Sequence, residues 1–257
     1  MISIFLKRWQ GPPFFMQTPQ SEFPHTRWTL LLTLREGSPE KSKDALEALC
    51  RAYWFPLYVV ARKRLSEFDA EDAVQGFFLS LLRRDALTQV DESRGRLRTF
   101  LLTAFENFCN QQWERQNTQK RGGEIEHIQL FTVHGAESRY IKHAEASTDD
   151  VETLYNREWA RTVLEGSLEA LSQDYAERGQ KARFDLLATH LTQEDPEISM
   201  AQSALSAGMT AEAYRTALHR LRQQYRGKIE SELARTLDTR DAGVIREELH
   251  ELFRAFS

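Results

Sequence analysis

The chain contains 257 residues, of which 41% are hydrophobic and 28% are charged, and its formal net charge at pH 7 is -4. This composition is ordinary for a folded protein with one or two modest cores, and it excludes a fibrous or wholly disordered chain. The longest apolar runs, residues 28–34 and 77–82, are far shorter than the roughly 20 residues that span a bilayer, so we expect no membrane-spanning helix. The negative net charge also argues against a protein that coats nucleic acid by bulk electrostatic attraction, which leaves local basic patches to be examined.

Residues 1–24 are rich in proline and are expected to form a disordered lead. The basic pair Lys7 and Arg8 follows the short apolar segment instead of preceding it, which is not the pattern of a signal peptide. Cys50 and Cys109 have no CxxC spacing, and the seven histidines are scattered. We therefore expect no metal site, no cofactor and a reduced, cytoplasmic setting.

Helical periodicity dominates the first half of the chain. Apolar residues recur at helical intervals in four stretches, at residues 26–34, 42–65, 69–82 and 97–108. The pattern predicts a helical bundle that forms a first domain at residues 25–121. Pro56 lies inside the second stretch and is expected either to kink the chain or to divide two helices there.

The stretch 69–82 predicts a helix with two different faces. Asp69 is placed to cap its first turn, and Glu71 and Asp72 lie where the helix dipole favours anions. One face is apolar and consists of Val74, Phe77, Phe78, Leu81 and Leu82. The opposite face carries Asp72, Gln75, Gly76 and Leu79. This mixture suits the helix of a binding partner, and the alternative is a capped surface helix with one exposed leucine.

The helix that begins near Leu97 changes character beyond its apolar turns. Its exposed side becomes a polar stripe that includes Asn107, Asn110, Gln111, Glu114 and Thr118, with Trp113 and Arg115 beside it. Asparagine and glutamine can bond to adenine edges, and an aromatic ring can stack on an unpaired base. The stripe therefore has the chemistry to read A-rich or melted DNA, and the alternative is an ordinary solvated helix.

Residues 122–150 lose periodicity and contain several glycine and serine residues, so we predict an interdomain linker there. Helical periodicity resumes at Val151 and predicts a second domain at residues 151–230. Residues 231–257 are expected to form a C-terminal helical extension. Its leucine stripe is expected to contact a domain or a partner, because it would otherwise be an exposed apolar patch.

The stretch 199–225 has the pattern of a helix-turn-helix. Ala204 allows two helices to cross closely, Gly208 turns the chain, and Thr210 is placed to cap the second helix. In that second helix the inward residues are Tyr214, Ala217, Leu218, Leu221 and Tyr225. The outward stripe is Arg215, His219, Arg222 and Arg226, flanked by Glu212, Thr216, Arg220 and Gln223. Such a helix can lie in the major groove, where arginine pairs with guanine, and the alternative is a basic, solvated helical hairpin.

Two motifs, Asp69-Ala-Glu-Asp-Ala-Val-Gln-Gly-Phe-Phe78 and the segment from Gly208 to Arg222, resemble the second and fourth regions of bacterial sigma factors. The similarity is to the extracytoplasmic-function type, in a planctomycete-like branch, and covers roughly Thr26 to Gly227. It implies an all-α fold with two helical domains: a bundle that binds core polymerase and melts the promoter, and a helix-turn-helix domain.

The resemblance also implies roles for individual residues. The residues implied to bind the largest subunit of core RNA polymerase are Asp69, Glu71, Asp72, Gln75, Phe78 and Leu79. Those implied to contact the downstream promoter element are Arg96, Arg98, Asn110, Gln111, Trp113, Arg115, Lys120 and Arg121. Those implied to contact the upstream element are Thr210, Glu212, Arg215, Thr216, His219, Arg220, Arg222 and Arg226.

The function implied is that of a sigma factor, which directs transcription initiation and catalyses nothing itself. Its partners would be core polymerase and promoter DNA, with an anti-sigma factor or a regulatory kinase as further candidates, and the free protein would be a monomer. A stand-alone helix-turn-helix regulator that acts as a dimer is the main rival. A carboxylate nuclease built on Asp69, Glu71 and Asp72 is a weaker rival, because capping already explains acids in a first turn.

Overall fold

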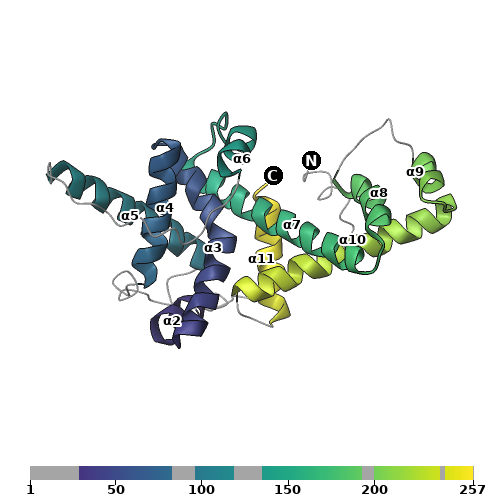
Figure 1. The fold of residues 1–257 in the computed structure, drawn as a ribbon, viewed down its shortest axis with the longest axis horizontal. Helices are drawn as coiled ribbons and strands as arrows, with labels where there is room; N and C mark the ends of the chain where they lie inside the picture. Colours follow the sequence, from purple (N-terminus) through teal and green to yellow (C-terminus); the bar gives the residue numbers. More distant parts are fainter. Residues whose placement is uncertain (1–28, 83–95, 119–134, 193–199, 238–240, 257) are drawn as a thin grey trace, which may run out of the picture. The chain divides into compact units, whose positions relative to one another are not determined.

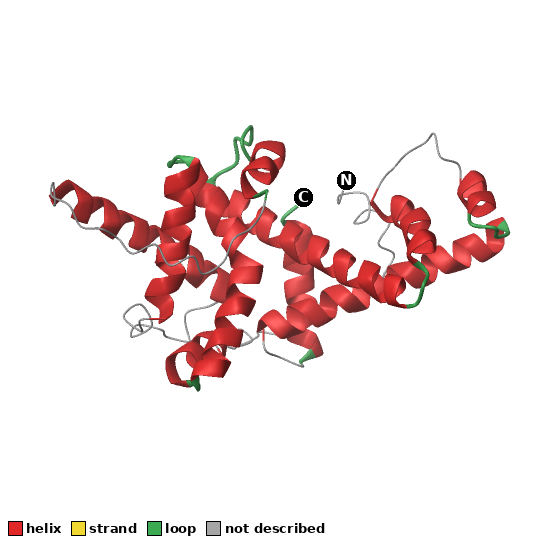
Figure 2. Ribbon diagram, in the orientation of Figure 1, coloured by secondary structure: helices red, strands yellow, loops and turns green. Residues whose placement is uncertain are grey.

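The computed structural model describes residues 29–82, 96–118, 135–192, 200–237 and 241–256. Within these ranges every regular element is an α-helix, which confirms the all-α fold class (Figures 1 and 2). None of the described helices combines the length and the apolar character needed to cross a membrane. The chain divides into two compact units: an N-terminal unit that runs to Thr162 and also includes Thr236–Arg240, and a C-terminal unit whose described residues belong to Val163–Arg235 and Asp241–Ser257.

The N-terminal unit is built around one long helix. Its helices are α2 (Thr29–Glu36), α3 (Pro39–Arg62), α4 (Glu67–Leu82), α5 (Leu97–Thr118), α6 (Ala136–His143) and the start of α7 (Val151–Glu177). Helix α3 packs against α2, α4 and α5, and all of its residues from Ala52 to Ala61 are buried. Since a helix that is apolar on all sides must be covered on all sides, this half of α3 forms the centre of the core.

Pro56 does not divide α3, which continues as one helix on both sides of it. The surrounding side chains explain why the helix persists. Trp54 and Tyr58 stack with ring centroids 5.2 Å apart, and Phe55 lies next to Tyr58. Packing of these buried aromatic rings outweighs the lost backbone donor of one proline.

Helix α6 lies in the segment for which we expected a linker. It is only eight residues long, and it buries Ala136 and Tyr140. Two turns give too short a pattern for helical periodicity to be recognised in the sequence. The rest of the expected linker up to residue 134 lies outside the described residues, as do residues 1–24.

The C-terminal unit contains the remainder of α7 and four further helices. They are α8 (Lys181–Thr192), α9 (Met200–Ser206), α10 (Ala211–Leu237) and α11 (Ala242–Arg254). The division between the two units thus falls inside α7, after Thr162. Helix α10 continues through Gly227 without a break, so the first part of the expected extension prolongs the helix-turn-helix.

Helix α10 is fixed against α7 by polar contacts. The Tyr225 hydroxyl donates to the Leu164 carbonyl at 2.9 Å, and the Tyr175 hydroxyl donates to Gln224 at 2.8 Å. Lys228 pairs with Asp174 at 2.8 Å. Tyr225 is buried, so its satisfied hydroxyl fixes the register of α10 as well as filling space.

Candidate functional site

Helix α4 starts two residues earlier than predicted. Ser66 is its capping residue: the Ser66 hydroxyl accepts from the Asp69 backbone N–H at 3.2 Å and donates to the Asp69 carboxylate at 2.7 Å. Ser66 thus caps the helix start, and Asp69 lies in the third helical position instead of the capping position. The Asp69 carboxylate is therefore engaged at the helix start.

The two predicted faces of α4 are largely present. The buried stripe consists of Ala70, Val74, Phe77, Phe78 and Leu81, and the partly exposed side carries Asp72, Gln75 and Leu79. Only 1% of the surface of Phe78 is exposed to solvent, so the side chain packs in the core beneath α4 and is not available to a partner in this structure. This corrects the expectation that Phe78 contacts polymerase directly.

Gly76 also differs from its predicted place on the outward face. A Cβ atom built on Gly76 would lie 3.2 Å from the Phe108 ring of α5. Phe108 in turn contacts Phe77, with ring centroids 5.9 Å apart. The glycine therefore permits a close approach of α4 and α5, which leaves Asp72, Gln75 and Leu79 as the outward face.

The start of α4 is strongly acidic. Partial burial raises the pKa of Glu71, and the neighbouring carboxylates of Glu67, Asp72 and Glu137 raise it further. Glu67, Asp69, Glu71 and Asp72 thus place four carboxyl groups in the first two turns of α4. A partner surface that carries lysine or arginine would complement them.

Glu137 comes from α6 and belongs to a second polar cluster. The Arg62 guanidinium donates to its two carboxylate oxygens at 2.6 and 2.9 Å, and the Tyr58 hydroxyl donates to it at 2.5 Å. The same guanidinium lies 4.8 Å from the centre of the Tyr140 ring. These contacts lower the pKa of Glu137, chiefly through the hydrogen bonds from Arg62. The cluster attaches α6 to α3 by charge and ring contacts.

The polar stripe of α5 is only partly described. Asn110 and Gln111 are exposed as predicted, and Arg96 is partly exposed at the helix start. The helix continues through Trp113 and Arg115, whose side chains lie outside the described part of the structure, and Lys120 and Arg121 lie beyond the described residues.

Arg98 differs from its predicted role. It is only 6% exposed, and its guanidinium stacks 4.5 Å from the centre of the buried Trp159 ring. Its backbone carbonyl accepts from the Tyr155 hydroxyl at 3.1 Å. Arg98 therefore joins α5 to α7 within the core, which corrects the expectation that it contacts DNA.

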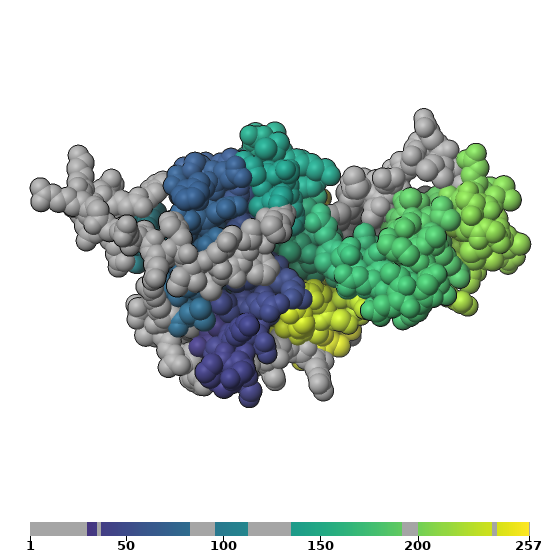
Figure 3. All heavy atoms as spheres, in the orientation of Figure 1, coloured from purple at the N-terminus to yellow at the C-terminus, as the bar shows by residue number. Residues whose placement is uncertain are grey.

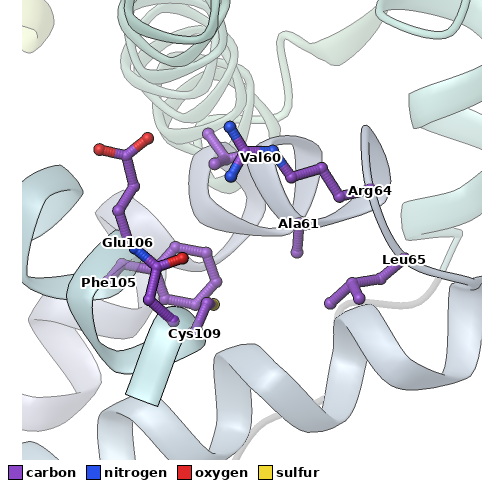
Figure 4. Close-up of a pocket in the computed structure, with 8 residues that line it drawn as sticks. Val60, Ala61, Arg64, Leu65, Phe105, Glu106 and Cys109 are labelled. Atoms are coloured by element: carbon purple, nitrogen blue, oxygen red, sulfur yellow. The ribbon is translucent and has the colours of Figure 1, made fainter. Parts of the chain in front are cut away.

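A small apolar hollow lies beside α5. Figure 4 shows Phe105 and Cys109 of α5 near Ala61 and Leu65, with the charged ends of Arg64 and Glu106 at its edge. Its volume of about 30 Å³ suits one or two water molecules and is too small for a nucleobase. Burial raises the pKa of Cys109 to about 11, so its thiol is not reactive at neutral pH.

The helix-turn-helix geometry is present in the C-terminal unit. Gly208 has a φ of 64°, in the left-handed region that favours glycine, and the Met209 N–H donates to the Ala204 carbonyl at 2.9 Å. Thr210 accepts from the Ala213 N–H at 3.2 Å, which confirms the predicted cap. The Tyr214 hydroxyl donates to the Leu186 carbonyl of α8 at 2.8 Å. The start of α10 is thereby anchored on α8 and α9.

The predicted inward residues of α10 are all buried, and they are Tyr214, Ala217, Leu218, Leu221 and Tyr225. Of the residues predicted to contact the upstream element, six are exposed: Thr210, Glu212, Arg215, Thr216, His219 and Arg220. Arg222 and Arg226 are partly exposed, and Arg226 pairs with Glu230 at 2.6 Å. The exposed basic side chains Arg215, His219 and Arg220 therefore lie in the first three turns of α10.

One further cation, Arg183, lies near this surface and was not predicted from the sequence. Arg183, in the first turn of α8, lines an open hollow together with Thr210, Glu212, Thr216 and Arg220 of the α10 side. Figure 3 shows α8 (green) and α9 (yellow-green) at the surface of this unit. No motif distinguishes Arg183 in the sequence, because its role depends on how α8 packs beside α10.

No group of three or more histidine, cysteine or acidic side chains able to hold a metal ion occurs in the described residues. The scan against protein-family models found no match, and neither the curated proteins nor the solved structures contain a match to this chain.

Proposed function

We propose that this protein is a sigma factor, a subunit that binds core RNA polymerase, recognises two promoter elements and directs transcription initiation. The observation that carries the proposal is the exposed basic start of α10, behind a left-handed turn at Gly208. Arg215, His219 and Arg220 face solvent there, and arginine is the side chain best suited to guanine in the major groove.

Two further surfaces support the proposal. In the N-terminal unit, α4 presents Asp72, Gln75 and Leu79 beside an acidic helix start, which suits the basic helix of a protein partner. On α5, Asn110 and Gln111 offer amides that can bond to adenine edges. In this proposal α4 binds polymerase, α5 contacts the downstream element and α10 reads the upstream element.

The test is run-off transcription with cognate core polymerase, with and without the full-length protein, followed by sequencing of the transcript starts. We expect new start sites that are preceded by two shared sequence elements at a constant spacing. The proposal is wrong if the protein neither co-purifies with core polymerase nor yields new starts. A dimer in light scattering, together with a palindromic footprint, would instead support a stand-alone regulator.

A further inference from the structure

Phe68 is an exposed aromatic side chain at the start of α4, and 65% of its surface is open to solvent. A single exposed apolar residue needs no functional explanation by itself. The position of Phe68 does call for one, because it falls on the face of α4 that carries the candidate contacts.

The helical register places Phe68 on that face. Steps of four, three and four residues lead from Phe68 to Asp72, Gln75 and Leu79, so the four side chains form one stripe. The opposite side of the helix is the one that meets the core, with Ala70, Val74, Phe77 and Leu81 buried. Phe68 lies ahead of the helix start predicted at Asp69, so the apolar pattern alone does not include it in this stripe.

The surroundings of Phe68 determine which kind of partner fits it. Glu67 and Asp69 adjoin it in the first turn, and Glu71 and Asp72 follow within the next turn. Burial raises the pKa of Glu71, and the neighbouring carboxylates of Glu67, Asp72 and Glu137 add to the increase. An aromatic ring inside an acidic rim complements a partner helix that carries lysine or arginine beside an apolar side chain.

We propose that Phe68 is the main apolar anchor of the α4 stripe and that a basic, amphipathic helix of core RNA polymerase covers it. This inference rests on the proposed function for the identity of the partner. A few residues supply most of the binding energy of a protein interface, and the contacts around them exclude water. Leu79 lies roughly 16 Å further along the helix and provides the second apolar contact.

The experiment measures the affinity of the full-length protein for core polymerase by fluorescence anisotropy, with the wild type, Phe68→Ala and Phe68→Leu. Phe68→Ala should weaken binding by about tenfold or more, and Phe68→Leu should restore part of the loss. Thermal unfolding should be unchanged, because the side chain is exposed. The matched control is Ile141→Ala, which removes an apolar side chain that is 54% exposed on α6 of the same unit, and it should bind like the wild type.

The salt dependence of binding to core polymerase distinguishes the apolar contact of Phe68 from the charged contacts around it. Glu71→Gln should reduce the salt dependence of binding, whereas Phe68→Ala should lower the affinity and leave the salt dependence as it is. If the wild type binds core polymerase and Phe68→Ala binds equally well, the anchor is wrong and the proposed function stands. If the wild type does not bind core polymerase, both are wrong.

Discussion

At the scale of single residues, the Arg62, Tyr58 and Glu137 cluster shows how charge is used inside the N-terminal unit. The side chains of Arg62 and Glu137 are only 17% and 21% exposed, so each depends on the other for solvation. We predict that Arg62→Ala lowers the free energy of unfolding by about 1–3 kcal/mol at pH 7, because Glu137 then loses its partner in a partly buried site. Urea denaturation measures this loss.

Arg51→Ala is the control for that experiment. Arg51 pairs with Glu47 in the same helix at 2.7 Å, but their side chains are 60% and 51% exposed. Removing this pair should cost no more than about 0.5 kcal/mol. An equal loss in the two variants would show that burial does not strengthen the Arg62 pair.

The Arg62 pair should also make stability depend on pH. Since the pKa of Glu137 is lowered in the folded state, the pair contributes fully above the ordinary pKa of 4.5 and its contribution is lost as the pH falls through the lowered value. The stability difference between the wild type and Arg62→Ala should therefore shrink in acid. Urea titrations at a series of pH values check this, and a difference that grows towards low pH would contradict it.

Arg215 and Arg226 should have different effects on DNA recognition. Arg215 is exposed in the first turns of α10, whereas Arg226 is paired with Glu230 further along. In holoenzyme, Arg215→Ala should cost about 1–3 kcal/mol and relax the preference at one upstream position. Arg226→Ala should weaken all promoters slightly and alike. A changed sequence preference in Arg226→Ala alone would show that the helix enters the groove in the opposite sense.

At the scale of elements, two glycines allow a matched test of the turn before α10. Gly208 has a φ of 64°, and a Cβ atom added there would touch nothing within 4 Å. Gly208→Ala should therefore cost about 1–2 kcal/mol through backbone strain alone. Gly166, inside α7, has equally open surroundings and no positive φ, so Gly166→Ala should stabilise by about 0.5–1 kcal/mol. Unfolding midpoints that move in the same direction would contradict the assigned role of the turn.

Helix α11 should contribute to stability and not to sequence preference. Asp241 caps it, and Leu249 and Leu252 are buried on one side. Leu252→Ala should lower the free energy of unfolding by about 2–5 kcal/mol, because it removes a fully buried side chain. The start sites sequenced with this variant should keep the wild-type promoter elements. An altered upstream element would instead assign α11 a part in reading DNA.

The sequence predicted helices best where a long apolar stripe repeats. The buried faces of α4 and α10 and the cap at Thr210 follow from periodicity and residue type alone. Short helices and the exact start of a helix were harder to predict. Helix α6 is held by contacts with residues distant in sequence, and the cap at Ser66 places the start of α4 ahead of the apolar pattern.

In the candidate sites, too, the sequence did not predict features that depend on contacts between residues distant in sequence. Exposure of Arg215 and His219 follows from helical spacing, but the burial of Arg98 on Trp159 depends on a contact between residues 61 positions apart. A basic residue near a polar stripe therefore indicates a binding surface only when tertiary packing leaves it in solvent. Arg183 is the opposite case, since packing alone brings it beside α10.

At the scale of the whole molecule, the charge balance predicts weak binding to DNA without polymerase. The net charge is -4, and the exposed cations of α10 are few. We expect the free protein to be a monomer of 29.9 kDa that shows only weak, salt-sensitive binding to duplex DNA. Light scattering and anisotropy measure the two properties. Tight, specific binding by the free protein would contradict the proposal that it needs core polymerase to bind promoters.

The continuity of helix α10 determines how the insertion of a residue would affect it. The same uninterrupted helix carries Arg215 near its start and the fully buried Ile229 and Leu233 further on. Each residue of a helix turns the chain by about 100°, so one residue added between Arg215 and Ile229 would put the two ends of α10 out of register by that angle. The buried face before the insertion and the buried face after it could then no longer both pack as they do. The direction in which Arg215 points relative to the buried face of α10 is thus fixed by the number of residues between them, and substitutions of single side chains leave that number unchanged.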